Sequence, residues 1–189
     1  MYSDVLNTIG FFNDWERLLF EKEIKLRYVN KNEILLQKGN IAASVFFNLK
    51  GSLYQHIKNE EKVEIIIDLH PENEWVLNHG SFLTQQPANS TITSYSGGIV
   101  LELSIQSIHY LIGQSLSFLQ LNKIINTAVS RIALFDNALT PREKYIYVLD
   151  TRPQLLQEFP LKMIASYLKI TPETISRVRE IILRGKSFY

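Results

Sequence analysis

The chain has 189 residues, of which 46% are hydrophobic, so it can form one large domain or two small ones and is not expected to be disordered. Cysteine is absent, which excludes disulfides, thiol nucleophiles, thiolate zinc sites and cysteine-ligated iron–sulfur clusters. The lack of cysteine fits a reducing compartment, and we expect a cytoplasmic protein. The N-terminal residues do not have the pattern of a signal peptide, and no apolar run of about 18 residues predicts a membrane span.

Charge is distributed unevenly along the chain. Residues 1–139 carry 11 basic and 14 acidic side chains, a net of −3, whereas residues 140–189 carry 9 and 5, a net of +4. A weakly acidic body followed by a basic segment suggests that only the C-terminal part meets a polyanion. A basic excess of this size also arises by chance, so charge alone does not show that the C-terminal part binds a polyanion.

A helix is expected to begin near Trp15, and β-rich runs follow it. Ser52–Lys58 and Val63–Leu69 are two such runs, and residues 59–62 between them predict a hairpin turn. Short strands separated by turn residues are typical of a small antiparallel barrel or sandwich.

A second hairpin is predicted further along the chain. Thr91–Tyr95 and Ile99–Ser104 flank Ser96-Gly97-Gly98, and glycine pairs are common in tight hairpin turns. We therefore expect these two strands to pair with each other.

An apolar stripe follows, in which the spacing alternates between three and four residues. Its members are Phe118, Leu121, Ile125, Ala128, Ile132, Phe135 and Leu139. This heptad-type pattern predicts a helix of about six turns. Either the helix packs on its own domain, or it pairs with its copy in a dimer. The regular spacing favours pairing. The residues expected at the dimer contact are Leu121, Ile125, Ala128, Ile132 and Phe135.

A new helix is predicted to start after residue 139, where the charge balance also changes. Thr140 can cap the helix, Pro141 suits its first position, and Glu143 completes a capping box. Pro153 is expected to end it, because proline disfavours helical backbone in the preceding residue. We place a domain boundary near residue 139.

Two short helices around a tight turn are predicted between Phe159 and Arg179. Leu161, Ile164, Ala165 and Leu168 share one helical face, and Lys169-Ile170 forms the turn. Thr171 can cap the second helix and Pro172 can occupy its first position. Such a unit can place its second helix in the major groove of DNA, although many two-helix hairpins share this apolar spacing.

The polar side chains of this unit suit nucleic-acid recognition. An arginine can donate to guanine O6 and N7, and a glutamate can accept from cytosine N4. Candidate contacts to the DNA backbone are Ser166, Tyr167, Lys169, Thr171 and Arg179.

Ile-Ala-Ser-Tyr-Leu (164–168) followed by Ile-Thr-Pro-Glu-Thr-Ile-Ser-Arg (170–177) resembles the helix-turn-helix of the CRP/FNR family of bacterial transcription regulators. The spacing of Glu173, Ser176 and Arg177 is similar to the recognition-helix pattern of its FNR-like members, which implies that these three side chains contact bases. Gly39 and Gly51 stand where the family's cyclic-nucleotide-binding-type β-roll has turn glycines, and the apolar stripe is similar to its dimerisation helix. The resemblance implies a homodimer.

Two features depart from the family's pattern. The turn commonly contains glycine, and here the corresponding residue is Lys169, which raises the cost of a positive φ. The chain also stops at Tyr189, soon after the second helix, so we expect the winged β-hairpin to be short or absent.

The resemblance also bears on the effector. Family members that bind cyclic AMP have a cassette with a Gly-Glu pair and a later arginine followed by serine or threonine. Here Glu74 is the counterpart of the glutamate and Ser90 of the hydroxyl residue, but Asn73 replaces the glycine and Asn89 the arginine. A buried phosphate without a cationic partner is costly. We therefore expect weak or no cyclic-nucleotide binding.

Whether another small-molecule effector binds stays an open question, and its identity is unknown. Trp75, His79, Phe82 and Tyr95 could line its pocket, although aromatic residues more often fill a core. The spacing of the four histidines is not that of metal ligands, so no metal site or cofactor is predicted. A single histidine gives little support for a haem or metal sensor. Catalytic motifs are absent, which indicates that the protein is not an enzyme.

The expected fold is α+β, with an antiparallel β-roll of the double-stranded β-helix (jelly-roll) type over residues 1–113, a dimerisation helix over 114–139 and a winged-helix-like helix-turn-helix domain over 140–189. The favoured function is a homodimeric transcription regulator that binds double-stranded DNA, with RNA polymerase as a further candidate partner and no membrane partner. The alternative is a ligand-binding or protein-interaction module of the same fold that reads DNA weakly or not at all.

Overall fold

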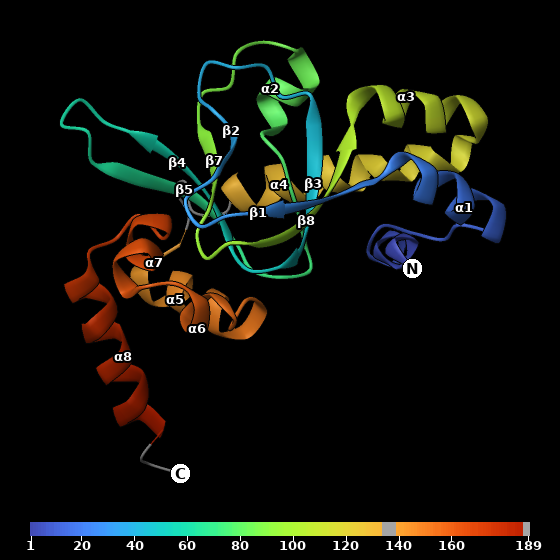
Figure 1. The fold of residues 1–189 in the computed structure, drawn as a ribbon. Helices are drawn as coiled ribbons and strands as arrows, with labels where there is room; N and C mark the ends of the chain where they lie inside the picture. Colours follow the sequence, from blue (N-terminus) through green and yellow to red (C-terminus); the bar gives the residue numbers. More distant parts are fainter. Residues whose placement is uncertain (134–138, 187–189) are drawn as a thin grey trace.

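A computed structural model describes residues 1–133 and 139–186 of the chain. Figure 1 shows a β-roll at the centre, with the N-terminal helices and α3 at one end and the C-terminal helices α5 to α8 against the opposite end. The helices before and after the roll are η1 (Tyr2–Thr8), α1 (Asp14–Glu23), α3 (Ile105–Gln114), η2 (Leu116–Leu121) and α4 (Asn122–Ala133), where η denotes a 3₁₀-helix. None of the described helices is long and apolar enough to cross a membrane.

The roll consists of two antiparallel sheets with the strand orders β1-β8-β3-β6 and β2-β7-β4-β5. A short helix, α2 (His79–Thr84), lies between β6 and β7. The strands are β1 (Lys25–Val29), β2 (Ile34–Leu36), β3 (Ser44–Lys50), β4 (Leu53–Lys58), β5 (Glu64–His70), β6 (Glu74–Val76), β7 (Thr91–Ser94) and β8 (Gly98–Ser104).

The first predicted hairpin is confirmed. β4 and β5 pair antiparallel, from Leu53 opposite His70 to Lys58 opposite Glu64. The Asn59 side chain accepts a hydrogen bond from the Val63 N–H at 2.8 Å and closes the turn.

The second predicted hairpin is wrong, although both strands exist. β7 pairs with β2 and β4 in one sheet, whereas β8 pairs with β1 and β3 in the other. Gly97 has a φ of 78°, and a Cβ on Gly98 would overlap the carbonyl oxygen of Lys50. The glycine pair therefore lets the chain pass close to another strand and change sheets. Gly39 and Gly51 have φ values of 93° and 91°, as expected of turn glycines.

The predicted six-turn helix is divided in the structure. Phe118 and Leu121 lie in η2, and α4 begins at Asn122. Phe118, Leu121 and Ala128 are 0%, 4% and 2% exposed and belong to the hydrophobic core of the roll. Leu121 and Ala128 therefore cannot serve as dimer contacts in this arrangement, because their surface is already covered within one chain.

The other residues predicted at the dimer contact do not lie in the core as Leu121 and Ala128 do, or are not described. Ile125 is half-buried at the edge of the core, while Val129, one turn further along α4, is 42% exposed. Ile132 and Phe135 lie outside the residues whose side chains the structure describes.

The C-terminal helices form a second hydrophobic cluster, which includes Tyr54, Ile66 and Leu69 from the roll. The predicted cap of the first helix is confirmed, since Thr140 and Glu143 exchange both hydrogen bonds of a capping box. The helices are α5 (Pro141–Thr151), α6 (Leu155–Glu158), α7 (Leu161–Tyr167) and α8 (Pro172–Lys186). The domain bounds 1–113, 114–139 and 140–189 stay a prediction.

Candidate nucleic-acid interface

The turn between α7 and α8 has the geometry of a Schellman motif. The Ile170 N–H donates to the Ala165 carbonyl and the Lys169 N–H to the Ser166 carbonyl, each at 3.0 Å. Lys169 has a φ of 55°, the left-handed conformation that usually favours glycine. Lys144 is buried, and its Nζ donates to the Leu168 carbonyl at 3.0 Å. A cation at this helix end compensates for the unsatisfied carbonyl groups.

The start of α8 is fixed as the sequence predicts. The Thr171 hydroxyl accepts a hydrogen bond from the Thr174 N–H at 3.2 Å, and Pro172 is the first helical residue. Ile175 is fully buried and Val178 is 6% exposed, so one face of α8 packs on the other C-terminal helices. The direction of the opposite face is set by this packing.

Glu173, Ser176 and Arg177 are all exposed. They occupy positions i, i+3 and i+4 of α8 and therefore share one face. A backbone hydrogen bond at its own N–H, and a second bond with the Thr171 side chain, lower the pKa of Glu173, so it is a carboxylate at neutral pH. The Ser176 hydroxyl donates to the Pro172 carbonyl at 3.1 Å, which leaves its lone pairs available. The predicted trio is thus brought together on an accessible surface.

The predicted contacts to the DNA backbone divide into two groups. Lys169 and Thr171 are exposed at the turn, next to the trio. Arg179 is half-buried, donates from Nε to the Tyr145 hydroxyl at 2.7 Å and lies over its ring, so it supports the packing of α8 on α5.

Tyr167 and Ser166 do not fit the predicted role. Tyr167 is 2% exposed, and its hydroxyl accepts a hydrogen bond from Arg152 at 2.7 Å. The Ser166 hydroxyl accepts from the Ile66 N–H of β5 at 2.9 Å. Both side chains face the roll rather than solvent, because α7 covers the edge strand of a sheet whose amide would otherwise lack a partner.

Arg152 joins the C-terminal helices to the roll. Its side chain is 7% exposed and faces Asp68, which is 1% exposed, with 3.4 Å between Nη1 and Oδ1. Nη2 lies 2.7 Å from Glu74 Oε2 and donates to the Leu69 carbonyl at 2.5 Å, while Nη1 donates to Tyr167. Burial alone would lower the pKa of Arg152, but Asp68 and Glu74 outweigh it and raise that pKa, so the guanidinium is always charged.

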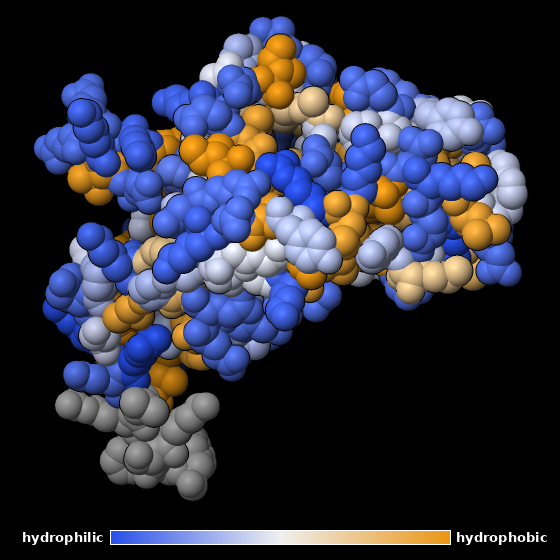
Figure 2. All heavy atoms as spheres, viewed as in Figure 1, coloured by the Kyte–Doolittle hydropathy of each residue, from blue (hydrophilic) through white to orange (hydrophobic). Residues whose placement is uncertain are grey.

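Further contacts lie beside this cluster. The Ser52 hydroxyl donates to Glu158 at 2.6 Å, and the Tyr95 ring packs on Phe159 with 5.3 Å between centroids. Figure 2 shows a hollow between the β4–β5 hairpin and the C-terminal helices, and Glu64 and Lys162 are among its lining residues. The C-terminal unit is therefore docked on the roll by polar and aromatic contacts together.

The sequence does not predict the contact between Arg152 and Asp68, because more than 80 residues separate them. One signal was present in the sequence. Asp68 stands between a run of three isoleucines and Leu69, and a buried carboxylate requires a cationic partner. The pattern does not show which of the 20 basic residues that partner is.

The interior of the roll does not bring the five predicted effector residues together. Glu74 is paired with Arg152, Trp75 donates from Nε1 to the Thr8 hydroxyl at 3.0 Å, and Phe82 is buried in the core. Asn89 is exposed. The expected grouping of Glu74 with Asn89 and Ser90 is therefore wrong, since β6 directs Glu74 towards the C-terminal helices.

Ser90 belongs to a buried polar network. Its hydroxyl oxygen lies 2.5 Å from Gln55 Nε2 and 2.7 Å from Asn78 Nδ2, and Asn78 also caps α2. The Ser90 hydroxyl is thus hydrogen-bonded by neutral side chains inside the roll, and none of these side chains carries a charge that would offset a phosphate. His79 is half-buried, and burial lowers its pKa. Among the residues with described positions, no three His, Asp or Glu side chains are grouped to hold a metal ion.

The two sheets, the helices that flank them and the capped two-helix unit define the fold of CRP/FNR-type regulators. FixK2 from Bradyrhizobium japonicum superposes with a TM-score of 0.68 at 13% identity, covering 86% of each chain. CLP of Xanthomonas campestris, described as a c-di-GMP-responsive global regulator, gives 0.58 at 14% identity over 92% of this chain and 93% of its own.

The catabolite activator protein of Thermus thermophilus gives a TM-score of 0.57 at 15% identity and covers 96% of this chain and 87% of its own. No family model and no curated protein matches the sequence. At such identities the likeness shows the fold. The resemblance noted in the sequence is therefore confirmed at the level of architecture.

Proposed function

We propose that this protein is a sequence-specific DNA-binding transcription regulator that acts as a homodimer and not as an enzyme. One observation carries the proposal: α8 presents Glu173, Ser176 and Arg177 on a single exposed face, behind a turn whose geometry is closed by hydrogen bonds at both ends. Two structural neighbours support it, since CLP is described as a global regulator and the Thermus thermophilus protein as a catabolite activator.

Each exposed side chain has a distinct chemical role in this proposal. Arg177 donates to O6 and N7 of a guanine in the major groove, and Glu173 accepts from the amino group of a cytosine. Lys169 and Thr171 contact phosphates and fix the register of α8 without carrying sequence information. The affinity for DNA then falls steeply with salt, because bound phosphates release counterions.

Dimerisation supplies a second copy of α8 that can contact DNA. Two copies related by a two-fold axis bind half-sites about one helical turn apart, and the site is an inverted repeat. Ile125 and Val129 of α4 remain accessible at the edge of the roll and are the described residues that suit this contact. RNA polymerase is a further partner of such a regulator, and the cytoplasm is the compartment that fits.

The roll acts as the sensor domain in this proposal, but cyclic AMP is not its trigger. Asn89 supplies no charge, and Ser90 is already satisfied by Gln55 and Asn78. Calorimetry with cyclic AMP and cyclic GMP should show weak or no binding. Tight stoichiometric binding of either nucleotide would refute this part of the proposal.

The DNA-binding proposal is tested by selection from a random-sequence duplex library with the full chain. We expect an enriched inverted repeat with its half-sites about 10 base pairs apart, centre to centre. Enrichment of no motif would remove the claim of sequence-specific binding.

A second function is favoured by one specific observation. Ser166 and Tyr167, two predicted backbone contacts, are engaged with the roll, and Arg179 is engaged with Tyr145. The same fold could therefore serve as a ligand-binding or protein-interaction module with weak or lost DNA binding. A mobility shift on genomic fragments at low and moderate salt separates the two, since the module predicts at most a weak shift at low salt and none at moderate salt.

A further inference from the structure

A concave pocket of about 470 Å³ lies on the outer face of the β2-β7-β4-β5 sheet, away from the interior of the roll. Tyr54, His56 and Thr93 form its floor, whereas Leu53 and Ile92 on the same strands point into the core. This pocket is therefore distinct from the interior position where Ser90 and Asn78 meet. Its volume falls within the range of small-molecule sites.

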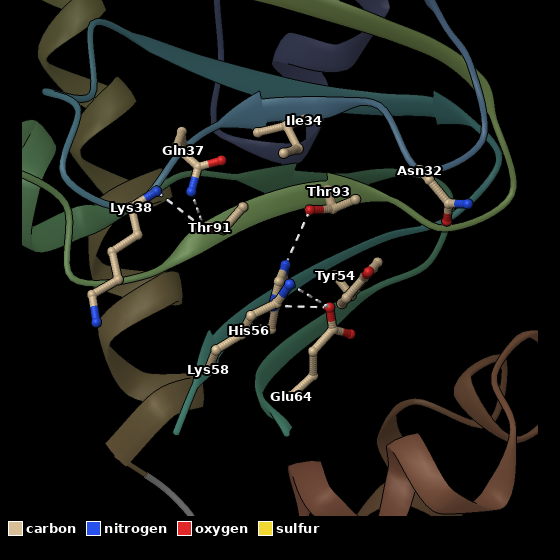
Figure 3. A pocket seen from close by; sticks show the side chains of 10 residues that line it. All are labelled: Asn32, Ile34, Gln37, Lys38, Tyr54, His56, Lys58, Glu64, Thr91 and Thr93. Carbon is tan, nitrogen blue, oxygen red and sulfur yellow. Dashed lines mark hydrogen bonds and ion pairs between the residues drawn. The ribbon is translucent and has the colours of Figure 1, made fainter. Parts of the chain in front are cut away.

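The floor contains a buried polar atom without a hydrogen bond. His56 is 6% exposed, and its Nε2 lies 3.2 Å from the Thr93 hydroxyl. Its Nδ1 has no hydrogen-bond partner, and the nearest carboxylate oxygen, on Glu64, lies 3.7 Å away. Figure 3 shows the imidazole between Thr93 and Glu64, beside the Tyr54 ring. Unsatisfied buried groups are rare in proteins and call for an explanation.

The two ends of the pocket differ in character. At one end, the Glu64 carboxylate and the His56 ring can accept hydrogen bonds from an amino or hydroxyl group. At the other end stand Gln37, Lys38 and Thr91, where the Lys38 N–H and the Gln37 amide both lie against the Thr91 hydroxyl. This second end can donate to an anionic group.

The charges favour an anion over a cation. The charged side chains that line the pocket are Lys38, Lys58 and Glu64. Lys58 Nζ is 3.8 Å from Glu64, so these two largely offset each other. Lys38 forms no ion pair among the described residues, which leaves one cation at the donor end. Burial lowers the pKa of His56, although Glu64 opposes the effect, so the ring adds no positive charge at neutral pH.

We propose that this outer pocket binds a small organic acid that also carries a hydroxyl or amino group. Its carboxylate contacts Lys38 and Gln37, and its hydroxyl or amino group fills the space between His56 Nδ1 and Glu64. Ile34 and the Tyr54 ring provide the apolar wall against which the carbon skeleton packs. The proposal does not depend on DNA binding, because residues of the β2-β7-β4-β5 sheet and of the turns next to β2 form the site.

The test uses the full chain without DNA and four probes: L-lactate, L-malate, L-serine and L-glutamate. Saturation-transfer NMR identifies binders at millimolar concentration, and titration calorimetry measures their affinity. We expect at least one probe to bind and to shift the imidazole resonances of His56. Lys38→Gln and Glu64→Gln should each weaken it about tenfold or more, as the loss of a charge-assisted hydrogen bond predicts.

Lys25→Gln is the matched control, because Lys25 is exposed on β1 in the other sheet. It should leave the affinity of the probe unchanged. Lys38 and Glu64 are surface side chains, so their variants should fold, and circular dichroism checks this. The proposal is overturned if none of the four probes binds, or if Lys38→Gln and Glu64→Gln bind the probe as tightly as the wild type. Either result leaves the DNA-binding proposal intact.

Discussion

Arg152 Nη2 lies 2.9 and 2.7 Å from the two carboxylate oxygens of Glu74, although 78 residues separate the two in sequence. This contact joins a strand of the roll to the end of α5. Asp68 and the Tyr167 hydroxyl complete the surroundings of the guanidinium. One buried cation therefore contributes to the position of the helix-turn-helix relative to the roll, together with the Ser52–Glu158 hydrogen bond and the packing of Tyr95 on Phe159.

Replacement of Arg152 should destabilise the fold strongly. Arg152→Ala leaves Asp68 buried without its cation, and loss of one partner of a buried pair typically costs about 3–5 kcal/mol. Glu74→Gln keeps the packing and retains one acceptor, so we expect a loss of about 1–2 kcal/mol. Urea denaturation measures both. A loss below about 1 kcal/mol for Arg152→Ala would contradict the role of this residue.

Lys169→Gly should stabilise the chain and weaken DNA binding at the same time. A left-handed backbone costs a residue with a Cβ roughly 1–2 kcal/mol, and the greater entropy loss of glycine cancels part of the gain, so we expect about 0.5–1 kcal/mol. The lost phosphate contact should reduce the affinity for DNA uniformly across sequences.

Lys169→Asn is the comparison for that variant, since asparagine tolerates the left-handed region and also removes the charge. It should bind DNA as weakly as the glycine variant with a smaller gain in stability. Thermal unfolding and binding titrations check the two effects. If Lys169→Gly were less stable than the wild type, the account of the turn would be wrong.

Local signals in the sequence predicted local structure well. Thr171-Pro172 and Thr140-Pro141 fixed two helix starts, because a cap acts within four residues of itself. The hairpin of β4 and β5 was also predictable, since its turn and both strands are contiguous. The face of α8 that carries Glu173 and Arg177 followed from helical spacing alone.

Contacts between residues that lie far apart in the sequence were not predictable in the same way. The glycine pair at 97–98 looks like a hairpin turn, and only the packing of Lys50 against Gly98 shows that the chain changes sheets there. Likewise, Tyr167 looks like an exposed polar residue until Arg152 and Asp68 are seen beside it. Both errors arise because the partner lies far away in sequence, where composition and periodicity carry no information.

The oligomeric state tests the proposed dimer. Sedimentation should show a dimer for the wild type, and Val129→Glu should shift it towards the monomer, because a charge at a contact in the core of an interface is costly. Thr127→Glu is the control, since Thr127 is exposed on another face of the same helix. A monomeric wild type would contradict the proposal, as would equal effects of the two variants.

Two histidines should make stability depend on pH. Burial lowers the pKa of His56 and His79 below their ordinary value of 6.5, so the unfolded chain binds more protons than the native one below that pH. The free energy of unfolding should therefore be unaffected above about pH 6.5 and fall as pH drops below it.

Urea denaturation at several pH values measures this dependence, and the double variant His56→Gln, His79→Gln isolates it. We expect the double variant to lose less stability than the wild type between about pH 6.5 and 5.5, because it lacks two groups that protonate on unfolding. Identical pH profiles for the two proteins would contradict the assignment.

The affinity of Arg177→Ala for a selected inverted repeat tests the central claim most directly. Anisotropy titrations should show a loss of about 1–3 kcal/mol on the selected site and a relaxed preference at one base pair of each half-site. Lys22→Ala, an exposed cation on α1, should bind as the wild type does. An unchanged affinity and unchanged base preference for Arg177→Ala would contradict the proposal that α8 reads DNA.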